Sequence, residues 1–573
     1  MKFELSKIIS EVAENLFDEQ IKATISYPDE KYGDYSCNVA MQLAGKLGQN
    51  PRVVAEQIAD KLAEHEVIAS AEVAGPGFLN LRMESEALLA SLESQKQAAE
   101  KRGQTFGENI DGKDKTVVVE YPSPNMAKPY SVGHLRPGNQ GWAVKQLMEA
   151  NGWNTITDNH LGDYGTPFGV WVVGFKKFSS EEKLASDGVY ELGRVYIETK
   201  AALKKEEQEG GDKLANEVQQ WLLKLEQGDA EATELSKRFN RISLEHIHNV
   251  MQRLKISTEH EMGEKFFVEK GKTAVQRLVD EGVAMQNDDG SVIVDLKEFG
   301  IETPILLQKS NGAALYATTD LATIEYRESE WKPDRVIYAA GSEQQFHFAQ
   351  LFALAKKLGV KTELIHLWFG TIDQKNEDGT REKMSSRKGV VLMEELLDEA
   401  EKRAGEVVKD REVSEEDVKK IALGAIKFTD FAADRRTNIL FDWKTMFNLT
   451  GYSGPYVQYA AVRMNKILRD NPEELKDFEA YNYSWQEEKP VLIKLLEYPE
   501  IVKYAAEAYE PHRVAAYVYE LARIMNRYYE KTPIATGEVS EDEKGARLAL
   551  IKQVSAVMQH GLHLLGIEVP ERM

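Results

Sequence analysis

The sequence predicts an α/β protein whose largest part is a parallel sheet covered by helices, and two observations support this class. Val117–Val119 is a β-branched run typical of a buried parallel strand, and a Pro- and Ser-rich turn separates it from a helical stretch that runs from Gly133 to Gly152. Other short β-rich runs alternate with helical patterns, which is typical of right-handed crossovers. We therefore expect a Rossmann-type domain, in which ligands bind at the carboxyl ends of the strands.

Composition limits the classes of protein that remain possible. The chain has 573 residues, of which 42% are hydrophobic and 29% charged, as expected of a globular protein. A single cysteine, Cys37, excludes an internal disulfide and a cysteine-based zinc site. No apolar run approaches the ~20 residues of a membrane span. The amphipathic, acidic start is unlike a secretory or transit peptide. We expect a cytoplasmic monomer.

The net charge of −22 argues against a protein that coats nucleic acid without specificity, and we expect neither DNA nor membranes as partners. Binding to RNA stays possible, because a local basic face is sufficient for it. On charge alone, a metabolic enzyme is the expected class.

Residues 1–112 are predicted to form a small α/β domain. A helix is expected over Glu4–Phe17, followed by two more helices, the second of which opens with Pro51 in its first turn. Ala71–Met83 has the pattern of a strand, a Gly-Pro-Gly turn and a second strand. A charged, Gly-containing linker at Gln97–Lys115 marks the boundary.

Two positions of the second strand are candidates for contact with RNA. Phe78 and Asn80 alternate with Leu79 and Leu81, so one of these pairs points away from the core. An exposed Phe beside an Asn can stack on a base and form hydrogen bonds with it. Spacing alone, however, favours a place in the core for Phe78.

Residues 113–390 are predicted to form the Rossmann-type domain, interrupted by a charged helical insertion over about 176–300. We expect the parallel sheet to contain the strand centred on Val118 and four further runs, Asn154–Asn159, Thr303–Gln308, Arg335–Ala340 and Ile365–Gly370. A helix at Phe346–Leu358 lies between the last two of these runs.

After a helical connection over 391–445, residues 446–573 are predicted to form an all-α bundle. Pro511–Tyr529 places apolar residues on one helical face, namely Val514, Val518, Leu521, Ile524 and Met525. Tyr456, Tyr459 and Arg463, near the start of the bundle, can hold unpaired bases by stacking. The pattern alone favours the core for these aromatics.

Two motifs suggest nucleotide chemistry. Ser-Val-Gly-His ends at His134, where a helix begins, and the free N–H groups of a helix N-terminus bind anions. Gly133 lets a nucleotide approach the backbone, and His134 can donate to phosphate or ribose. Far along the chain, Glu382–Gly389 reads EKMSSRKG, a basic small-residue loop suited to a triphosphate. Taken singly, these motifs fit ordinary α/β packing and a solvated basic turn.

Together the two motifs resemble those of class I aminoacyl-tRNA synthetases. The flanking runs resemble the arginyl-tRNA synthetases in particular: SPNMAKP before the first motif, GDYGTPFG at 162–169, YATTDLA at 316–322 and the close LLGIEVPERM. The resemblance extends from about Tyr32 to Met573. It implies a class I synthetase-type catalytic domain, a small N-terminal domain that contacts the D-loop of tRNA, and an anticodon-binding helical bundle.

The resemblance also implies an activity and its site residues. The activity is the formation of arginyl-adenylate from L-arginine and ATP with Mg2+, followed by transfer of arginine to the 3'-terminal adenosine of tRNA(Arg). Implied ATP-site residues are Lys128, Ser131, Gly133, His134, Lys383, Met384, Ser385, Ser386, Arg387 and Lys388. Implied arginine-site residues are Glu120, Ser123, Asn125, Glu264, Tyr316, Asp320 and Gln344. Implied tRNA-binding residues are Phe78, Asn80, Tyr456, Gln458, Tyr459 and Arg463.

Side-chain chemistry agrees with these roles. Carboxylates are the natural partners of a planar guanidinium, and Tyr316 and Asp320 lie one helical turn apart. The chemistry needs positioning and cations rather than a covalent nucleophile.

The sequence departs from the family pattern at four places. Ser131 stands where the class has a first His, and its hydroxyl can donate to phosphate without carrying a positive charge. The second motif is KMSSR rather than KMSKS, for which Lys128 is thought to compensate. Pro167 replaces a Gln, and Lys265 replaces a Ser.

Two rival interpretations remain open. One is a catalytically weakened or inactive paralogue that acts as a tRNA-binding protein, which should have lost its arginine and ATP residues. The other is a class I synthetase for a different amino acid, against which the carboxylates Glu264 and Asp320 argue, because they suit a cationic side chain.

Overall fold

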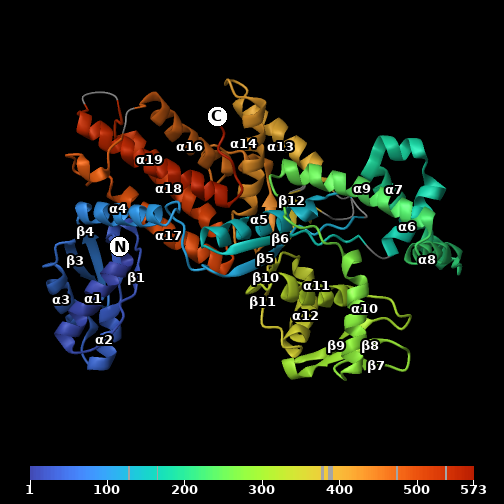
Figure 1. Cartoon of the computed structure of the whole chain (residues 1–573). Coiled ribbons are helices and arrows are strands. Elements are labelled where there is room, and N and C mark those ends of the chain that lie inside the picture. Colours follow the sequence, from blue (N-terminus) through green and yellow to red (C-terminus); the bar gives the residue numbers. More distant parts are fainter. Residues whose placement is uncertain (127–128, 164–165, 376–379, 385–390, 473–474, 536–538) are drawn as a thin grey trace. The chain divides into compact units, whose positions relative to one another are not determined.

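The computed structural model describes residues 1–126, 129–163, 166–375, 380–384, 391–472, 475–535 and 539–573 (Figure 1). The chain forms two compact units. Unit 1 comprises residues 1–109, 459–504 and 516–561, and unit 2 comprises residues 110–458, 505–515 and 562–573.

The α/β part of unit 1 is built on a four-stranded antiparallel sheet with the order β1-β2-β4-β3. Its strands are β1 (Ile25–Ser26), β2 (Tyr35–Cys37), β3 (Ile68–Ala74) and β4 (Phe78–Met83). The helices are α1 (Lys2–Phe17), α2 (Val39–Leu47), α3 (Pro51–Leu62) and α4 (Ser85–Lys101). The predicted first helix, the strand–turn–strand and the helix opening at Pro51 are confirmed. The Asn50 side chain caps α3 by accepting a hydrogen bond from the Arg52 N–H at 2.9 Å.

Four long helices contribute most of their residues to unit 1. They are α16 (Gly454–Asp470), α17 (Lys489–Ala508), α18 (His512–Lys531) and α19 (Glu541–Leu564). The predicted apolar face of α18 is confirmed, because Val514, Val518, Leu521 and Met525 are fully buried and Ile524 is half-buried. Burial of this face, rather than helix propensity, stabilises the bundle.

Unit 2 contains the predicted parallel sheet, with the strand order β11-β10-β5-β6. Its strands are β5 (Thr116–Glu120), β6 (Asn154–Asp158), β10 (Arg335–Tyr338) and β11 (Glu363–His366). β5 lies in the middle, and Val117, Val118 and Val119 are fully buried. The chain passes from β5 through α5 (Leu135–Ala150) to β6, whereas β10 lies on the other side of β5. A ligand site is expected where the strand order reverses, at the carboxyl ends of β5 and β10.

One predicted strand does not belong to this sheet. β9 (Ile301–Gln308) pairs with β8 (Val292–Leu296), which pairs with β7 (Met285–Gln286), in a separate antiparallel sheet. The assignment of Thr303–Gln308 to the parallel sheet was therefore wrong, because a short apolar run identifies a strand but not its partner. The last predicted strand, Ile365–Gly370, is in fact β11 and ends at His366.

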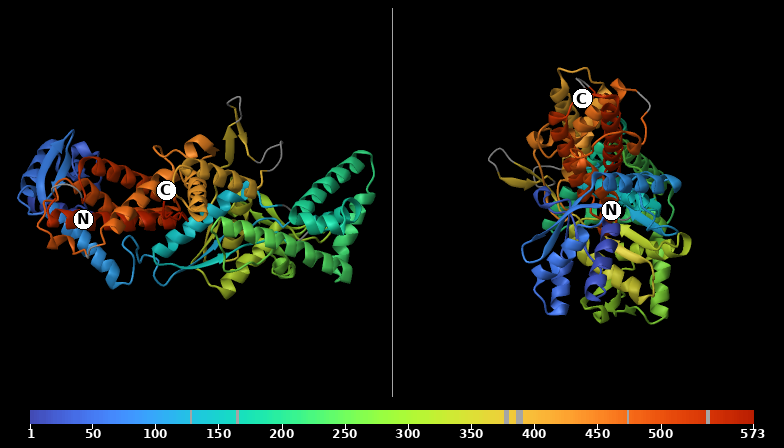
Figure 2. Two further views of the ribbon diagram at one scale, coloured as in Figure 1. Left: turned by 90° about the horizontal axis from the view of Figure 1, so that it is seen from above. Right: turned by 90° about the vertical axis from the view of Figure 1, so that its left-hand side faces the viewer.

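The predicted charged helices form an insertion between β6 and β10. They are α6 (Thr166–Phe178), α7 (Glu181–Gln208), α8 (Lys213–Glu226) and α9 (Ala230–Arg253), followed by α10 (Glu264–Asp280). Figures 1 and 2 show α6, α7 and α8 grouped at one end of unit 2, with α9 running back from them toward the parallel sheet. α7 is interrupted at Gly188, whose φ is 53°.

The remaining elements of unit 2 surround the sheet. They are α11 (Tyr316–Glu330), α12 (Gln345–Lys357), α13 (Met393–Val408), α14 (Glu415–Asp430), α15 (Trp443–Met446) and the small sheet of β12 (Ile372–Lys375), β13 (Arg381–Lys383) and β14 (Ile439–Phe441). Among the described residues of the whole chain, no helix has the length and apolar character needed to cross a membrane.

Candidate active site

The first motif lies at the end of the segment that connects β5 to α5. Val132–His134 form a single 3-10 turn, and α5 begins at Leu135. The Ser131 N–H donates to His134 Nδ1 at 3.2 Å, and Ser131 Oγ lies 3.4 Å from the same nitrogen. Since Nδ1 accepts, the proton of the neutral ring is on Nε2, which can donate to an anion. Gly133 is exposed, and a Cβ there would meet only Ser131 Oγ.

A pocket of about 190 Å³ brings this motif together with distant parts of the chain. It is lined by Val132, Gly133, Arg136, Gly341, Glu343, Phe369, Gly370, Thr371, Ile372 and Met384. Met384 belongs to the second motif, and its N–H donates to the Ile372 carbonyl at 3.0 Å. A Cβ on Gly370 would lie 2.6 Å from the Thr437 carbonyl, so the backbone is closely packed here. Described residues of both motifs therefore border one pocket.

Several predicted ATP-site residues cannot be placed by this geometry. Lys128 and the four residues Ser385, Ser386, Arg387 and Lys388 lie outside the described residues. Lys383 ends β13, where its backbone pairs with Asp373 of β12.

A buried ion pair holds one wall of the pocket. Arg136 Nε donates to Asp430 at 2.9 Å, and its Nη1 donates to the carbonyls of Gly370 and Thr437 at 2.9 and 2.8 Å. Gln140 donates to the same oxygen of Asp430 at 3.1 Å. Because a buried charge needs several partners, these bonds fix Gly370 against α5.

The predicted guanidinium site is a cluster of acidic side chains from α10, α11 and the loop after β6. Tyr316 opens α11, and Asp320 follows one turn later, as predicted. Glu264 is the first residue of α10, and burial, then Asp320 and Asp163, raise its pKa to about 8. Burial and the nearby Glu264 also raise the pKa of Tyr316. The carboxyls of Glu264 and Asp320 and the Tyr316 phenol therefore act on one another electrostatically.

Asp163 belongs to the GDYGTPFG run, and the sequence did not predict it as a site residue. Its Oδ1 accepts from the Lys265 N–H at 2.9 Å, and the Glu264 N–H donates to the Leu161 carbonyl at 2.9 Å. These bonds fix the first turn of α10 and hence Glu264. The Lys265 departure is tolerated because this contact uses its backbone. Pro167 lies in the first turn of α6, where a missing N–H costs little.

His347 of α12 was also missed by sequence reasoning. Its Nε2 lies 2.7 Å from Asp320 Oδ2, so the imidazole fixes the orientation of that carboxylate. No spacing rule links positions 320 and 347, which belong to different helices.

The other four predicted arginine-site residues lie at or after the carboxyl ends of β5 and β10. Glu120 ends β5, Gln344 is exposed in the turn after β10, and Asn125 is exposed in the loop after β5. Ser123 Oγ accepts from the His160 N–H at 3.2 Å, so this hydroxyl also orders its own loop. Arg327, fully buried on α11, donates to both Glu120 and Asp158 at 2.7 Å.

The predicted RNA-facing residues divide into exposed and buried ones. Phe78 is 40% exposed, which contradicts a core position. Asn80 is only 9% exposed and accepts a hydrogen bond from Ser36 Oγ at 2.9 Å, so its side chain offers little surface to RNA. Strand alternation gave the correct face, but Ser36 of the neighbouring strand β2 stands directly opposite Asn80 and donates to it.

Among the helical residues, Arg463 is exposed, and its guanidinium carbon lies 4.6 Å from the centroid of the Tyr529 ring. Tyr456 and Tyr459 are half-buried. Gln458 is fully buried, and its Nε2 donates to the carbonyls of Lys420 and Glu568. The structure thus contradicts the RNA-binding role of Gln458, since it has no surface to offer.

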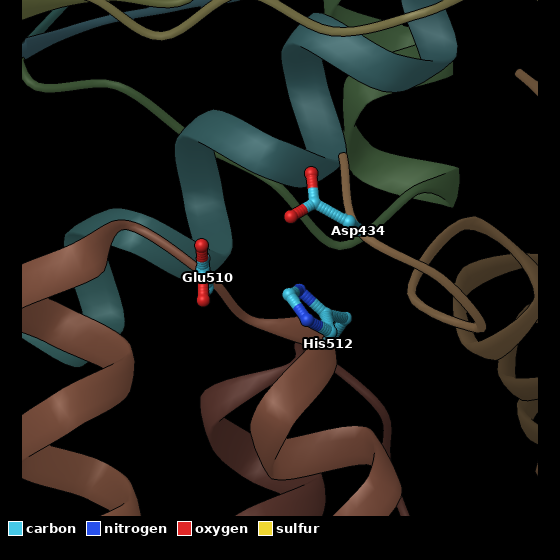
Figure 3. A group of neighbouring side chains, drawn as sticks. All are labelled: Asp434, Glu510 and His512. Atoms are coloured by element: carbon cyan, nitrogen blue, oxygen red, sulfur yellow. The ribbon is translucent and has the colours of Figure 1, made fainter. Parts of the chain in front are cut away.

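One group of side chains has the spacing of metal ligands (Figure 3). Ligand atoms of Asp434, Glu510 and His512 all lie within 4.8 Å of one another. Arg436, however, donates to both carboxylates, and its hydrogen bond holds the pKa of Asp434 well below the usual range. The guanidinium already supplies the positive charge that a metal would bring, so we assign the group as an ion pair.

Comparison with known proteins identifies the family. Family models described as "tRNA synthetases class I (R), catalytic domain", "DALR anticodon binding domain" and "Arginyl tRNA synthetase N terminal domain" match residues 97–443, 457–573 and 3–83.

Full-length relatives agree with these matches. An "Arginine--tRNA ligase" of Fusobacterium nucleatum is 32% identical over 584 residues, covering 100% of this chain and 99% of the relative. "Arginine--tRNA ligase 1" of Bacillus cereus is 34% identical over 594 residues, with 100% of both chains covered. In fold, the chain resembles the Thermus thermophilus arginyl-tRNA synthetase with a TM-score of 0.80 at 24% identity, covering 100% of both chains. This chain belongs to the arginyl-tRNA synthetases of class I.

Proposed function

We propose that this arginyl-tRNA synthetase makes arginyl-adenylate in the space between the pocket at Gly133 and the acidic cluster at Glu264, and then charges tRNA(Arg). In the first step, an arginine carboxylate oxygen attacks the α-phosphorus of MgATP and pyrophosphate leaves. In the second step, a ribose hydroxyl of the terminal adenosine attacks the arginyl carbonyl, and AMP leaves. The observation that carries the proposal is that described residues of both motifs line one pocket at the strand-order reversal.

The ATP side of the site acts through positioning and donors rather than through a nucleophile. Gly133 permits close approach of the phosphates, and the N–H groups at the start of α5 face them. His134 donates from Nε2, and Ser131 supplies a neutral hydroxyl. Lys128, Lys383, Arg387 and Lys388 are the proposed cations for the triphosphate, with Ser385 and Ser386 in the same loop.

The arginine side selects a planar cation. Asp320, held by His347, and Glu264, held by the first turn of α10, offer two carboxylates to a guanidinium, and Tyr316 covers it. A lysine ammonium cannot form the same bidentate pairs. Gln344, Asn125, Ser123 and Glu120 are the proposed partners of the amino-acid head group.

For tRNA, we retain Phe78, Tyr456, Tyr459 and Arg463 as proposed contacts and withdraw Asn80 and Gln458, whose side chains are buried. Aromatic side chains stack on bases without reading their sequence, and Arg463 adds a positive charge. Matches to the N-terminal and anticodon-binding family models support this division of labour. We expect the enzyme to act in the cytoplasm as a monomer, without zinc.

The test is ATP-dependent charging of total tRNA by the purified protein, run separately with each of the twenty amino acids. Charging with arginine alone is the expected result, and it would show that Ser131 and Pro167 are compatible with catalysis. Charging with another amino acid would overturn the assignment of the acidic cluster. Intact tRNA binding without any charging would instead establish the inactive, tRNA-binding paralogue.

A further inference from the structure

The first nucleotide motif pairs with the segment that follows the second motif, in a short stretch of antiparallel backbone that we call the motif junction, residues 130–132 with 391–393. The Val132 N–H donates to the Val391 carbonyl at 3.0 Å, and the Met393 N–H donates to the Tyr130 carbonyl at 3.0 Å. Ser131 and Leu392 face each other in this pairing. Val132 lines the pocket, so the position of the junction sets the position of the pocket wall.

Helices α7 and α9 of the insertion hold the chain that leads into this junction. Ser243 Oγ of α9 donates to the Met126 carbonyl at 2.8 Å. Gly193 of α7 packs so closely on Pro129 that a Cβ there would lie 2.8 Å from its Cδ. These contacts lie on either side of Lys128 in the sequence.

A third contact reaches the junction itself. The Tyr130 N–H donates to His246 Nε2 of α9 at 3.1 Å, in a fully buried position. Tyr130 thereby uses both of its backbone groups, one on His246 and one on Met393. Among the described residues this N–H has no other acceptor, and an unsatisfied buried N–H is costly.

The surroundings of His246 fix its ring. The Tyr190 ring of α7 packs edge-on against it with centroids 5.7 Å apart, and the Tyr190 hydroxyl donates to Glu394 in the first turn of α13. Glu394 Oε1 also lies 3.8 Å from His246 Nδ1. Burial lowers the pKa of His246, which keeps the ring neutral and its Nε2 able to accept.

We propose that His246, a residue of the helical insertion and of neither nucleotide motif, is a positioning residue for the ATP site. It fixes the motif junction by accepting the Tyr130 N–H. The proposal rests on the proposed function, because the pocket is taken to bind ATP. The insertion thereby becomes part of the nucleotide site without touching the nucleotide.

Paired variants separate the acceptor from the bulk of the ring. Gln at position 246 places an amide oxygen near the position of Nε2, whereas Asn is too short and Phe has the volume without an acceptor. His248→Phe is the matched control, because it makes the same change two residues later on α9, at an exposed side chain that pairs with Glu261.

The first readout is binding of a non-hydrolysable MgATP analogue with an α,β-methylene bridge, measured by calorimetry. We expect His246→Phe and His246→Asn to weaken binding about tenfold, the effect of losing one buried hydrogen bond. His246→Gln should stay within threefold of the wild type, and His248→Phe within twofold. The second readout, pyrophosphate exchange in the presence of tRNA, should show a raised ATP KM and an unchanged arginine KM.

Two results would overturn the proposal. One is equal binding by the Gln and Asn variants, because the acceptor would then be irrelevant. The other is a uniform loss of ATP and arginine affinity, which indicates general damage. His246→Asn and His246→Gln share size and polarity closely enough that unfolding of the Phe variant does not block the comparison. If the wild type binds the analogue but exchanges no pyrophosphate, the proposed function fails while the test of His246 still stands.

Discussion

Two groups of carboxylates in unit 2 are similar in composition and opposite in state. Glu120 and Asp158 share the buried Arg327, which donates to both at 2.7 Å. Glu264, Asp320 and Asp163 form the second group, in which Glu264 has no ion pair among the described residues and burial raises its pKa to about 8. The first group is paired with an arginine of the chain, whereas Glu264 of the second group is the acid for which we propose a bound arginine as partner.

This difference predicts that the acids paired with Arg327 affect the stability of the fold, whereas the acids around Glu264 affect the affinity for arginine. A buried acid with a resident cation contributes to the fold, and breaking the pair leaves charge without compensation. A buried acid without one is kept protonated near neutral pH and gains its partner only on binding. A raised carboxyl pKa thus marks an acid that lacks a resident cation, whereas Glu120 and Asp158 already have one in Arg327.

The largest expected effect follows from removing the resident cation. Arg327→Met should lower the free energy of unfolding by about 3–5 kcal/mol, because Glu120 and Asp158 stay buried without a partner. Thermal unfolding followed by circular dichroism measures this change. The control Arg277→Met removes a half-exposed guanidinium paired with Glu325, which should cost less than about 1 kcal/mol. Equal costs for the two variants would erase the distinction between the two groups.

A second variant tests the group that contains Glu264 and Asp320. Asp320→Ala should reduce kcat/KM for arginine by about 30- to 1,000-fold, equivalent to about 2–4 kcal/mol for one partner of a charge pair, and should weaken discrimination against lysine. The melting temperature and the ATP KM should stay unchanged. Steady-state exchange kinetics are compared with those of Glu330→Gln, an exposed change at the far end of α11. A drop in stability instead of affinity would place Asp320 with the structural acids.

The third prediction uses pH. Below its pKa of about 8, Glu264 is protonated and neutral, and a bound guanidinium lowers that pKa, so binding releases a proton. Arginine affinity should therefore rise with pH, by at most about tenfold per unit, and level off above about pH 8. The arginine KM from pH 6.5 to 8.5 measures this, and Glu264→Gln should flatten the profile. A flat profile in the wild type would refute the vacancy of this group.

The smallest effect is expected on the ATP side. Ser131→Ala removes one neutral donor and should slow pyrophosphate exchange about fivefold, near 1 kcal/mol, without changing the arginine KM. Ser131→Thr keeps the hydroxyl in an extended backbone that suits a β-branched residue and should retain the wild-type rate. An equal loss in both variants would show that the hydroxyl is not the active group.

The elements with strong local patterns could be predicted from the sequence. The β-branched run of β5, the apolar face of α18 and the one-turn spacing of Tyr316 and Asp320 are local properties, and the structure reproduces all three. Strand partners are not local, which is why β9 was assigned to the wrong sheet.

The errors at the candidate site have the same cause. Alternation correctly places Asn80 on the face opposite Leu79 and Leu81, but its exposure also depends on Ser36 of the neighbouring strand, which donates to its side chain. Likewise, the burial of Gln458 depends on carbonyls of α14 and of the C-terminal segment. Arg327 and His347 act through partners on other elements, so no spacing within one segment could reveal them.

The motif junction also has a consequence for how the enzyme acquires its activity during synthesis. Ser131 and Leu392 face each other in the folded chain, but the whole insertion, β10 and β11 lie between them in the sequence. Closing so long a loop carries an entropic cost before its contacts repay it, so such pairings form late in folding. A nascent chain that stops short of α13 can therefore build β5 and α5 but lacks the partner strand of the first motif. Nucleotide binding should consequently appear late on the ribosome, when α13 emerges, and not when the first motif does.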